Sequence, residues 1–371
     1  MKRAKCYDRA LVWLTLGFLF LFGTLLLVCP QKKLSESENR ALRTWEASSW
    51  QGLLDGSLSE TVSVVTRDQF PMRECWVSFK ARCEQALGKR ENNGVLLGAD
   101  GYLMARDEYV DLSIAKENLR AAEGFSKAWE SPVTSVWVPR SCDVMARWLP
   151  DQYPSDAARR LFELLNETPH SFLQAKAEEK TKIYYRTDHH LTTEGAYFLY
   201  CELGARLGYV PRAHEEFSVE TVSEQFFGSA DSAVGGIASR ADRIELYRYE
   251  GDERFLVTDG ETGEIREGFY DASALEHKDQ YAVFLGGNFA HLSVKETRGI
   301  EKPKLLLIKD SFANALIPFL AIHFDLEIID LRYVAGEIFV DACDRVLILQ
   351  GVDTLATDRS LGKLALIKKK G

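Results

Sequence analysis

The sequence predicts an α/β fold, with a mostly parallel sheet that helices cover on both faces and one apolar helix ahead of it. Two patterns predict the sheet. Short, near-continuous apolar runs recur in the second half of the chain, and such runs suit strands that are buried on both faces. Helical segments separate the last three runs, and this alternation is typical of parallel strands joined by helices. A third pattern, the uncharged stretch 10–29, predicts the apolar helix.

The N-terminal segment predicts a membrane anchor. About 20 helical residues cross the ~30 Å hydrocarbon core of a bilayer, and residues 10–29 form an uncharged run of that length. Basic residues flank this run more heavily before it than after it, namely Lys2, Arg3, Lys5 and Arg9, then Lys32 and Lys33. The more positive flank stays in the cytoplasm. We therefore expect a single-pass protein of the cell membrane. Residues 1–9 would form a cytoplasmic tail, residues 10–29 would form a transmembrane anchor in contact with bilayer lipid, and the rest of the chain would be extracytoplasmic.

A cleaved signal peptide is the alternative for this segment. The apolar core of a signal peptide is shorter, at roughly 7–15 residues, and small residues mark its cleavage site. Here the run is longer, and Val28-Cys29-Pro30 is a poor cleavage site. The pattern therefore favours an uncleaved anchor.

A spacer and a helical segment are expected at 30–90. Leu58 to Leu87 has the pattern of one or two amphipathic helices, broken at Phe70-Pro71. The segment 94–103 then has the pattern of two short strands around an Asp-Gly turn. A helix is expected from Leu112 to Trp129, with its apolar residues near one face.

The remaining elements alternate, and we assign 91–371 to one domain. Two short apolar runs predict strands, at Val133–Val138 and Lys182–Tyr185. Helices are expected at Asp156–Asn166 and at Thr193–Leu207, and Gly208 is a natural C-terminal stop for the second helix. The later apolar runs are expected strands: Tyr281–Leu285, Lys304–Ile308, Leu326–Leu331 and Val346–Leu349. The interval 209–280 breaks this rhythm and is hairpin-like around Glu250-Gly251-Asp252. We interpret it as an insertion that covers a site.

Charge and cysteine spacing disfavour several classes of function. The formal net charge is −9 with dispersed acidic residues, and nucleic-acid binding depends on phosphate neutralisation by Lys and Arg, so no nucleic-acid partner is expected. None of the seven cysteines lies in a Cys-x-x-Cys motif, which disfavours a zinc or redox site. We expect no cofactor.

Two segments carry residues that suit acyl transfer. In 187–196, between a strand and a helix, Asp188 precedes His190 by two positions and could orient it as a general base. In 305–314 an apolar strand ends in a sharp turn, and Ser311 stands just before a helix whose first N–H groups can stabilise an oxyanion. Ser, His and Asp are the minimum set for this chemistry.

Structural roles are the alternative for each of these residues. Asp310 or Ser311 could be a helix N-cap, and so could Thr192 or Thr193. The adjacent His189 and His190 could be a packing pair. Asp188, His189 and His190 could also bind a metal ion. The sequence shows no paired third or fourth ligand elsewhere, so no metal site is expected.

Several motifs together resemble the DHHW family of bacterial membrane-anchored proteins, which are similar to the alginate O-acetyltransferases. The motifs are Asp188-His189-His190 with Thr192 and Gly195-Ala196, Lys309-Asp310-Ser311-Phe312 with Pro318-Phe319, His323, Ile329 to Tyr333, Ser37-Glu38-Asn39-Arg40, Asp68 to Arg73, Gly94 to Leu103, and Gly286-Gly287-Asn288. The resemblance implies a permuted SGNH-hydrolase-like three-layer sandwich. It also implies that Ser311 is the nucleophile, His190 the base and Asp188 the group that orients it.

The sequence departs from the family pattern at two places. Leu191 stands where the family name expects Trp, and Gln350-Gly351 stands where the resemblance implies Tyr-Asn. Gln350 could still donate a hydrogen bond to an oxyanion. Asn288 and His189 are further expected substrate contacts, although His189 could equally serve packing alone.

Arg332 and Tyr333 follow the predicted strand Leu326–Leu331, so they should emerge at the same sheet edge as Ser311. We expect Arg332 to bind an anionic or hydroxyl-rich group of the substrate, and Tyr333 to be a further substrate contact. An ion pair with Asp330 is the alternative.

These inferences predict an extracytoplasmic, membrane-anchored serine esterase or O-acetyltransferase that acts on cell-surface or exported polysaccharide. Its expected partners are a polysaccharide or acetylated glycan and a membrane protein that donates acyl groups. A catalytically inactive glycan-binding or envelope-assembly protein of the same fold is the alternative. If His190 is the base, turnover should fall as the pH drops through an imidazole pKa, ordinarily near 6.5.

Overall fold

The computed structural model describes residues 2–35, 40–45, 57–106, 110–150, 153, 156–166, 168–179, 181–299 and 301–370. The Ser37-Glu38-Asn39 part of one family motif lies outside these residues. The chain divides into two compact units, which are described separately. The first comprises Met1–Lys89 with Val234–Ile237, and the second comprises Arg90–Ala233 with Ala238–Gly371.

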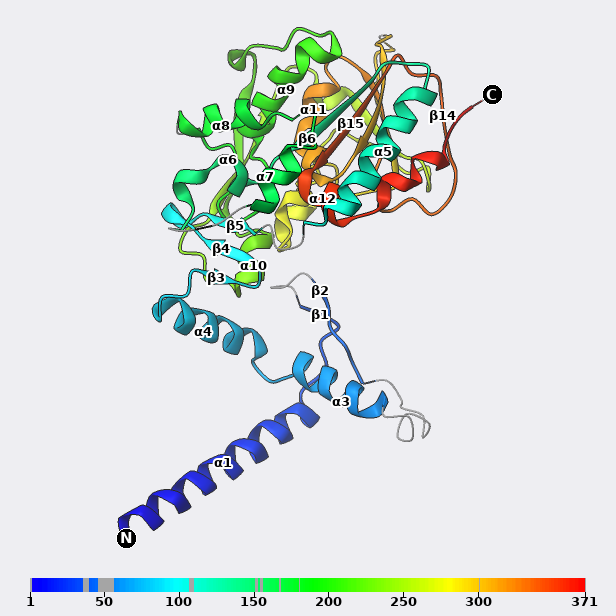
Figure 1. Cartoon of the computed structure of the whole chain (residues 1–371). Coiled ribbons are helices and arrows are strands. Elements are labelled where there is room, and N and C mark those ends of the chain that lie inside the picture. The colour runs from blue at the N-terminus through cyan, green and yellow to red at the C-terminus, as the bar shows by residue number, and fades with distance from the viewer. Residues whose placement is uncertain are drawn as a thin grey trace. The chain divides into compact units, whose positions relative to one another are not determined.

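The first unit begins with helix α1, Lys2–Val28 (Figure 1). Its segment Arg9–Val28 is long and apolar enough to cross a membrane and is the one such segment among the described residues. This helix fits a single-pass anchor, and a signal sequence would share its features. Helices α3, Ser57–Asp68, and α4, Arg73–Ala86, follow, with the predicted break at Phe70-Pro71 between them.

The second unit is built on a seven-stranded mixed sheet. Its strand order is β10-β9-β11-β13-β12-β15-β6. The bounds are Ile265–Glu267 for β10, Phe255–Asp259 for β9, His291–Glu296 for β11, Asp325–Ile329 for β13, Lys304–Lys309 for β12, Arg345–Gly351 for β15 and Val133–Val138 for β6. The strands from β13 to β6 run parallel, while β10, β9 and β11 pair antiparallel. The predicted α/β class is confirmed, with a sheet more mixed than expected.

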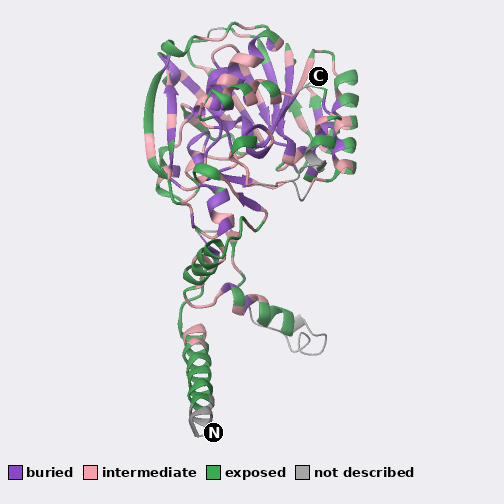
Figure 2. Cartoon of the chain, turned by 60° about the vertical axis from the view of Figure 1, so that its left-hand side comes forward, coloured by how far each residue is buried: buried purple, intermediate pink, exposed green. Residues whose placement is uncertain are grey.

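Helices cover both faces of this sheet. Leu305 and Leu307 of β12 belong to a buried cluster on one face, together with residues of α9, Thr193–Leu207. Leu306 and Ile308 belong to the cluster on the other face, with residues of α5, Leu112–Ala128, and α12, Val352–Thr357. Side chains alternate along a strand, so each face receives every second residue. The result is a three-layer sandwich whose interior is buried on both sides (Figure 2).

Shorter elements make up the rest of the described secondary structure. The helical ones are η1 Ala99–Gly101, α6 Ser141–Val144, η3 Ala146–Trp148, α7 Asp156–Phe162, α8 His170–Glu178, η4 His214–Glu216, α10 Ser229–Val234, η5 Asp252–Arg254, η6 Ala272–Glu276, η7 Gln280–Val283, η8 Ser311–Leu316, α11 Ile317–Leu320 and η9 Ser360–Leu366. The strands are β1 Leu34–Ser35, β2 Arg40–Ala41, β3 Glu91–Asn92, β4 Val95–Leu97, β5 Leu103–Ala105, β7 Ser218–Phe226, β8 Asp242–Arg248, β14 Ile338–Val340 and β16 Ile367–Lys369.

Two predicted strands are wrong. The segment 182–185 forms only an isolated bridge, between Tyr184 and Leu191. The segment 281–285 is instead largely the 3-10 helix Gln280–Val283. Both runs are apolar because they are buried, and a short apolar run does not distinguish a strand from another buried segment.

The interval 209–280 is only partly an insertion. Strands β7 and β8 form a separate two-stranded sheet, whereas β9 and β10 extend the main sheet. The expected hairpin at 250–252 is wrong, because β8 pairs with β7 and β9 pairs with β10 and β11. Gly251, with φ of 94°, and the 3-10 turn Asp252–Arg254 direct the chain from one sheet to the other.

The start of α9 packs closely against the preceding segment. Thr192 caps this helix, as expected, by accepting a hydrogen bond from the Gly195 N–H. A Cβ atom at Gly195 would collide with the backbone carbonyl of Ile183. That carbonyl accepts a hydrogen bond from the Thr192 N–H at 2.9 Å, so it cannot move away freely. Glycine is therefore required where α9 meets the loop that carries Asp188 and His190.

Gly195→Ala should lower the free energy of unfolding by about 1–3 kcal/mol, since overpacking a rigid backbone contact costs about that much. Gly124→Ala is the matched control, because Gly124 lies in α5 and nothing lies within 4 Å of the position that the alanine methyl group would occupy. It should instead raise the unfolding free energy by about 0.5–1 kcal/mol. Urea unfolding followed by circular dichroism measures both, and equal effects of the two substitutions would contradict the close contact.

Candidate active site

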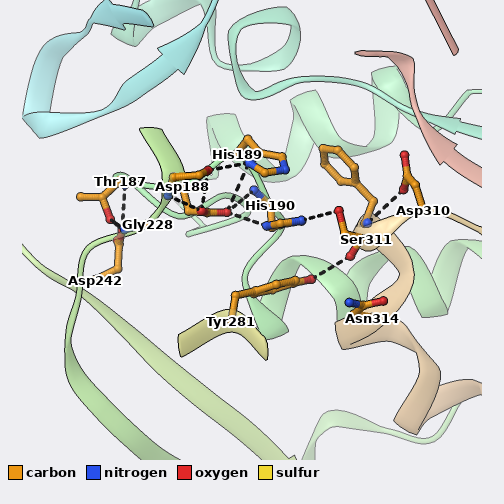
Figure 3. A network of polar contacts seen from close by, with 12 residues as sticks. Thr187, Asp188, His189, His190, Gly228, Asp242, Tyr281, Asp310, Ser311 and Asn314 are labelled. Carbon is orange, nitrogen blue, oxygen red and sulfur yellow. Dashed lines mark hydrogen bonds and ion pairs between the residues drawn. The ribbon is translucent and has the colours of Figure 1, made fainter. Parts of the chain in front are cut away.

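The carboxyl ends of the parallel strands meet at one edge of the sheet. Strand β12 ends just before Asp310 and Ser311, β13 ends before Asp330, and β15 ends at Gly351. In an open α/β sheet this edge is where ligands bind. The loop with Asp188 and His190, which precedes α9, reaches the same place (Figure 3).

Ser311, His190 and Asp188 form a continuous chain of hydrogen bonds. His190 Nε2 lies 2.8 Å from Ser311 Oγ, and His190 Nδ1 lies 2.6 Å from Asp188 Oδ1. An ionised carboxylate only accepts, so Nδ1 carries the proton and Nε2 is free to accept from the serine hydroxyl. The structure thus brings together residues 121 positions apart in the geometry that a serine nucleophile and its base require.

Asp310 holds the Ser311 turn in place. It is the N-cap of η8, and its Oδ1 accepts from the Phe312 N–H at 3.0 Å. Its Oδ2 accepts from the Gly351 N–H at 2.8 Å and from the Thr354 hydroxyl at 2.6 Å. Asp310 therefore takes the capping role that the sequence left open between it and Ser311. All of 311–320 is described, and Ser311 is the one residue there that is not buried.

The Asp188 carboxylate is buried and receives donors on both oxygens. Besides Nδ1 of His190, Oδ1 accepts from the His190 backbone N–H at 2.9 Å. Oδ2 accepts from both the N–H and the hydroxyl of Ser229, each at 2.8 Å. A Cβ atom on Gly228 would collide with the Asp188 side chain, so a glycine allows this close approach. The segment 228–229 is thus shaped around the carboxylate.

Two aromatic rings enclose the imidazole of His190. The Tyr281 ring stacks on it at 3.9 Å between centroids and 7° between planes. The Tyr281 hydroxyl donates to the Ser311 carbonyl at 3.3 Å. Phe312 contacts the imidazole with a centroid distance of 5.5 Å. These contacts restrict the ring to the orientation that reaches Ser311.

The electrostatic environment leaves Asp188 ionised and His190 neutral at neutral pH. Burial, together with the neighbouring His189, lowers the pKa of His190 from 6.5 to about 4, although Asp188 acts in the opposite direction. Burial alone would raise the pKa of Asp188, but the two imidazoles and the hydrogen bonds from His190 and Ser229 hold it well below its usual range. A neutral imidazole beside an ionised carboxylate is the protonation state of a general base.

His189 lies beside the chain of hydrogen bonds rather than in it. Its Nδ1 is 2.8 Å from the Ser229 hydroxyl, and its ring centroid is 3.8 Å from that of His190. Because the Ser229 hydroxyl donates to Asp188, His189 Nδ1 must be the donor to Ser229. The side chain of His189 is 37% exposed, whereas that of His190 is 8% exposed.

The ligand atoms of Asp188, His189 and His190 all lie within 4.8 Å of one another, a spacing that could hold a metal ion. Nδ1 and Nε2 of His190 already face Asp188 and Ser311, so an ion bound through His190 would displace one of these partners. These three side chains are therefore arranged for hydrogen bonding, and metal binding would require them to rearrange. The expected absence of a metal stays a prediction.

Arg332 and Tyr333 lie just beyond β13, as expected. The Arg332 guanidinium forms two hydrogen bonds with Asp330, from Nε to Oδ1 at 2.9 Å and from Nη2 to Oδ2 at 2.6 Å. This is the ion pair that the sequence offered as an alternative. Tyr333 is 52% exposed, and the guanidinium lies 5.5 Å from its ring centroid. Their part in substrate binding stays a prediction.

Asn288 belongs to a buried polar network behind the Ser311 turn. Its Oδ1 accepts from Lys309 Nζ at 3.0 Å and from Asn314 Nδ2 at 3.2 Å. Lys309 Nζ also lies 3.4 Å from Asp330 Oδ2. Burial lowers the pKa of Lys309, and Asp330 opposes that shift. The network links the end of β12 to Asn314 in η8, and a substrate contact by Asn288 remains a prediction.

The two departures from the family pattern are both buried. Leu191 is fully buried in the core. Gln350 is 1% exposed, and neither atom of its amide has a hydrogen-bond partner among the described residues. An unpaired buried amide costs free energy. The predicted hydrogen bond from Gln350 to an oxyanion stays untested.

Sequence reasoning missed Ser229 and Tyr281. Ser229 lies in the interval interpreted as an insertion, and Tyr281 in an expected strand. Neither has a local signal of its role, because both contact the site only through tertiary packing. The Gly228-Ser229 pair, at the start of a short helix, is the one sequence feature that could have drawn attention to this segment.

Comparisons with known proteins agree with this fold. A structure described as a DHHW family protein from Eubacterium siraeum has a TM-score of 0.59 and 20% identity, covering 76% of this chain and 98% of that one. Bacillus cereus PatB1 with a sulfonyl adduct has a TM-score of 0.58 and 17% identity, covering 73% and 97%. The O-acetyltransferase domain of Pseudomonas putida AlgJ is less similar, with a TM-score of 0.42 and 15% identity, covering 73% and 98%, which is below the similarity that indicates a shared fold.

No curated protein matches this chain. A family model described as DHHW protein matches residues 170–329, which include Asp188, His190 and Ser311. The family resemblance that the sequence motifs indicate is therefore confirmed: the segment 170–329 matches the DHHW family model, and the chain shares its α/β fold with a DHHW family protein and with PatB1.

Proposed function

We propose that this protein is a membrane-anchored, extracytoplasmic serine O-acetyltransferase or esterase that acts on cell-surface or exported polysaccharide. One observation carries the proposal: Ser311 Oγ, His190 Nε2 and Asp188 form an unbroken hydrogen-bonded chain at the carboxyl edge of the sheet. The basic flank before α1 supports the outward orientation of the domain.

In the proposed first step, Ser311 Oγ attacks the carbonyl carbon of an acetyl ester while His190 Nε2 takes the hydroxyl proton. In this proposal the start of η8 supplies the donor for the oxyanion. Phe312 and Ala313 donate theirs to Asp310, so the Ser311 N–H is the one left to stabilise it. His190 then returns the proton to the leaving alcohol oxygen, and the acetyl group stays on Ser311.

In the second step the acetyl group leaves Ser311. His190 takes a proton from water or from a sugar hydroxyl as that oxygen attacks the acyl carbon, and Ser311 regains its proton. Attack by water makes the protein an esterase, and attack by a sugar hydroxyl makes it a transferase. A membrane protein that supplies acyl groups is the proposed donor for the transferase.

Ser311→Ala should reduce the hydrolysis of 4-nitrophenyl acetate by about 10⁶-fold and abolish covalent labelling by a sulfonyl fluoride, because the nucleophile is lost. Ser218→Ala, on the exposed strand β7, is the control and should retain both. Mass spectrometry of the intact chain measures the labelling. Equal labelling of the wild type and Ser311→Ala would contradict the proposal and favour an inactive glycan-binding protein.

The pH dependence should follow the lowered pKa of His190. Protonation of Nε2 removes the base, so kcat/KM should fall as the pH drops through about 4 rather than through the ordinary 6.5. His189→Gln removes a neighbour that lowers the pKa of His190, so the acid limb should move to higher pH. A wild-type limb near 6.5, unmoved by His189→Gln, would show that His190 is not held neutral in this way.

Ser229 is a positioning residue for Asp188. Ser229→Ala keeps the backbone donor but removes a hydroxyl that donates to a charged oxygen, a bond worth about 1.5–3 kcal/mol. We expect kcat to fall about 10- to 100-fold with KM unchanged. Ser232→Ala is the matched control, since Ser232 lies in the same helix and its hydroxyl donates to the Gly228 carbonyl instead. A rise in KM with kcat unchanged would mean that Ser229 binds substrate.

A further inference from the structure

Helix α4 carries an apolar stripe along one side. The stripe consists of Met72, Trp76, Phe79, Cys83 and Leu87, whose spacings of three and four residues place them on one helical face. All five are exposed, Met72 at 67% and Phe79 at 63%. Contiguous exposed apolar surface marks an interaction site.

The opposite side of α4 is already covered within its own unit. The Ser78 hydroxyl donates to the Gly235 carbonyl at 2.5 Å. A Cβ atom on Gly235 would lie 3.1 Å from Val77 and 3.4 Å from Ala81, which shows how closely this segment packs. The stripe is therefore the side of α4 that the described part of this unit leaves uncovered, except where Trp76 contacts Phe22 of α1.

Contacts with α1 place the start of the stripe at a defined level of the apolar helix. Phe22 of α1 stacks on Phe70 at 5.3 Å and meets the Trp76 ring edge-on at 6.0 Å. Phe22 lies six residues before the end of the candidate span at Val28, which is about 9 Å along a helix. In a bilayer-spanning α1, Trp76 would lie at about this depth inside the outer end of the span, and the apolar face of an interfacial helix is buried to a depth of about 5–10 Å.

We propose that α4 lies in the outer interfacial zone of the bilayer, with this stripe against the acyl chains. Arg73, Lys80 and Arg82 flank the stripe, and basic residues beside an apolar face suit a helix that contacts anionic headgroups. This inference rests on the membrane anchor of the proposed function. It adds a second membrane contact, immediately outside the anchor.

The test uses the full chain in bilayer nanodiscs that contain phosphatidylglycerol, with one nitroxide label on an otherwise cysteine-free variant. The label is placed at Cys83 in the stripe, at Gln85→Cys on another face of α4, or at Leu19→Cys within α1. Each variant must keep the thermal unfolding midpoint of the unlabelled chain. Electron paramagnetic resonance then measures collisions with oxygen, which enters lipid, and with a nickel chelate, which stays in water.

The ratio of oxygen to nickel collisions should be severalfold higher at position 83 than at position 85, and high at position 19. If position 19 is in lipid but 83 resembles 85, the anchor stands and the interfacial placement of α4 is overturned. Shielding of position 83 from both reagents would also overturn it, and would indicate a second copy of the chain on the stripe. A nickel-accessible label at position 19 would remove the anchor itself, while leaving the esterase assay at Ser311 unaffected.

Discussion

The buried Asp188 carboxylate is the group on which the rest of the site depends. A buried charge is costly unless donors surround it, and here each oxygen accepts two hydrogen bonds, from His190 and from Ser229. These donors come from two distant parts of the chain. The requirement to satisfy one anion therefore joins the loop before α9 to the segment 228–229, fixes the tautomer of His190 and turns its Nε2 toward Ser311.

Two other carboxylates hold the Ser311 turn. Asp310 ties the turn to Gly351 and Thr354 at the end of β15 and in α12, and Asp330 neutralises Lys309 beneath it. The aspartates therefore have different tasks at one sheet edge: one orients the base, one caps the turn and one compensates a buried cation. The carboxylates of Asp310 and Asp330 are buried and already have partners within the protein. Ser311, which is only partly buried, therefore carries the accessible reactive group of this turn.

Much of this arrangement could be predicted because its causes are local. Strands β6, β12, β13 and β15 and helices α5 and α9 appear as apolar runs or periodic patterns, and Gly208 and Thr192 mark the ends of α9. The chemical candidates Asp188, His190 and Ser311 were also visible, since each stands where a strand or loop meets a helix. The segments 182–185 and 281–285 were mistaken for strands because their apolar character reflects burial rather than strand pairing.

The sequence by itself determined the apolar N-terminal helix, the α/β class and the residue types that suit acyl transfer, because composition and periodicity record burial and helix ends directly. Only the tertiary structure decided which partners those residues have. It paired Arg332 with Asp330, buried Gln350 without a partner among the described residues, stacked Tyr281 on His190 and brought Ser229 to Asp188. Such contacts join positions tens of residues apart or depend on which way a side chain turns, and no local pattern in the chain specifies either.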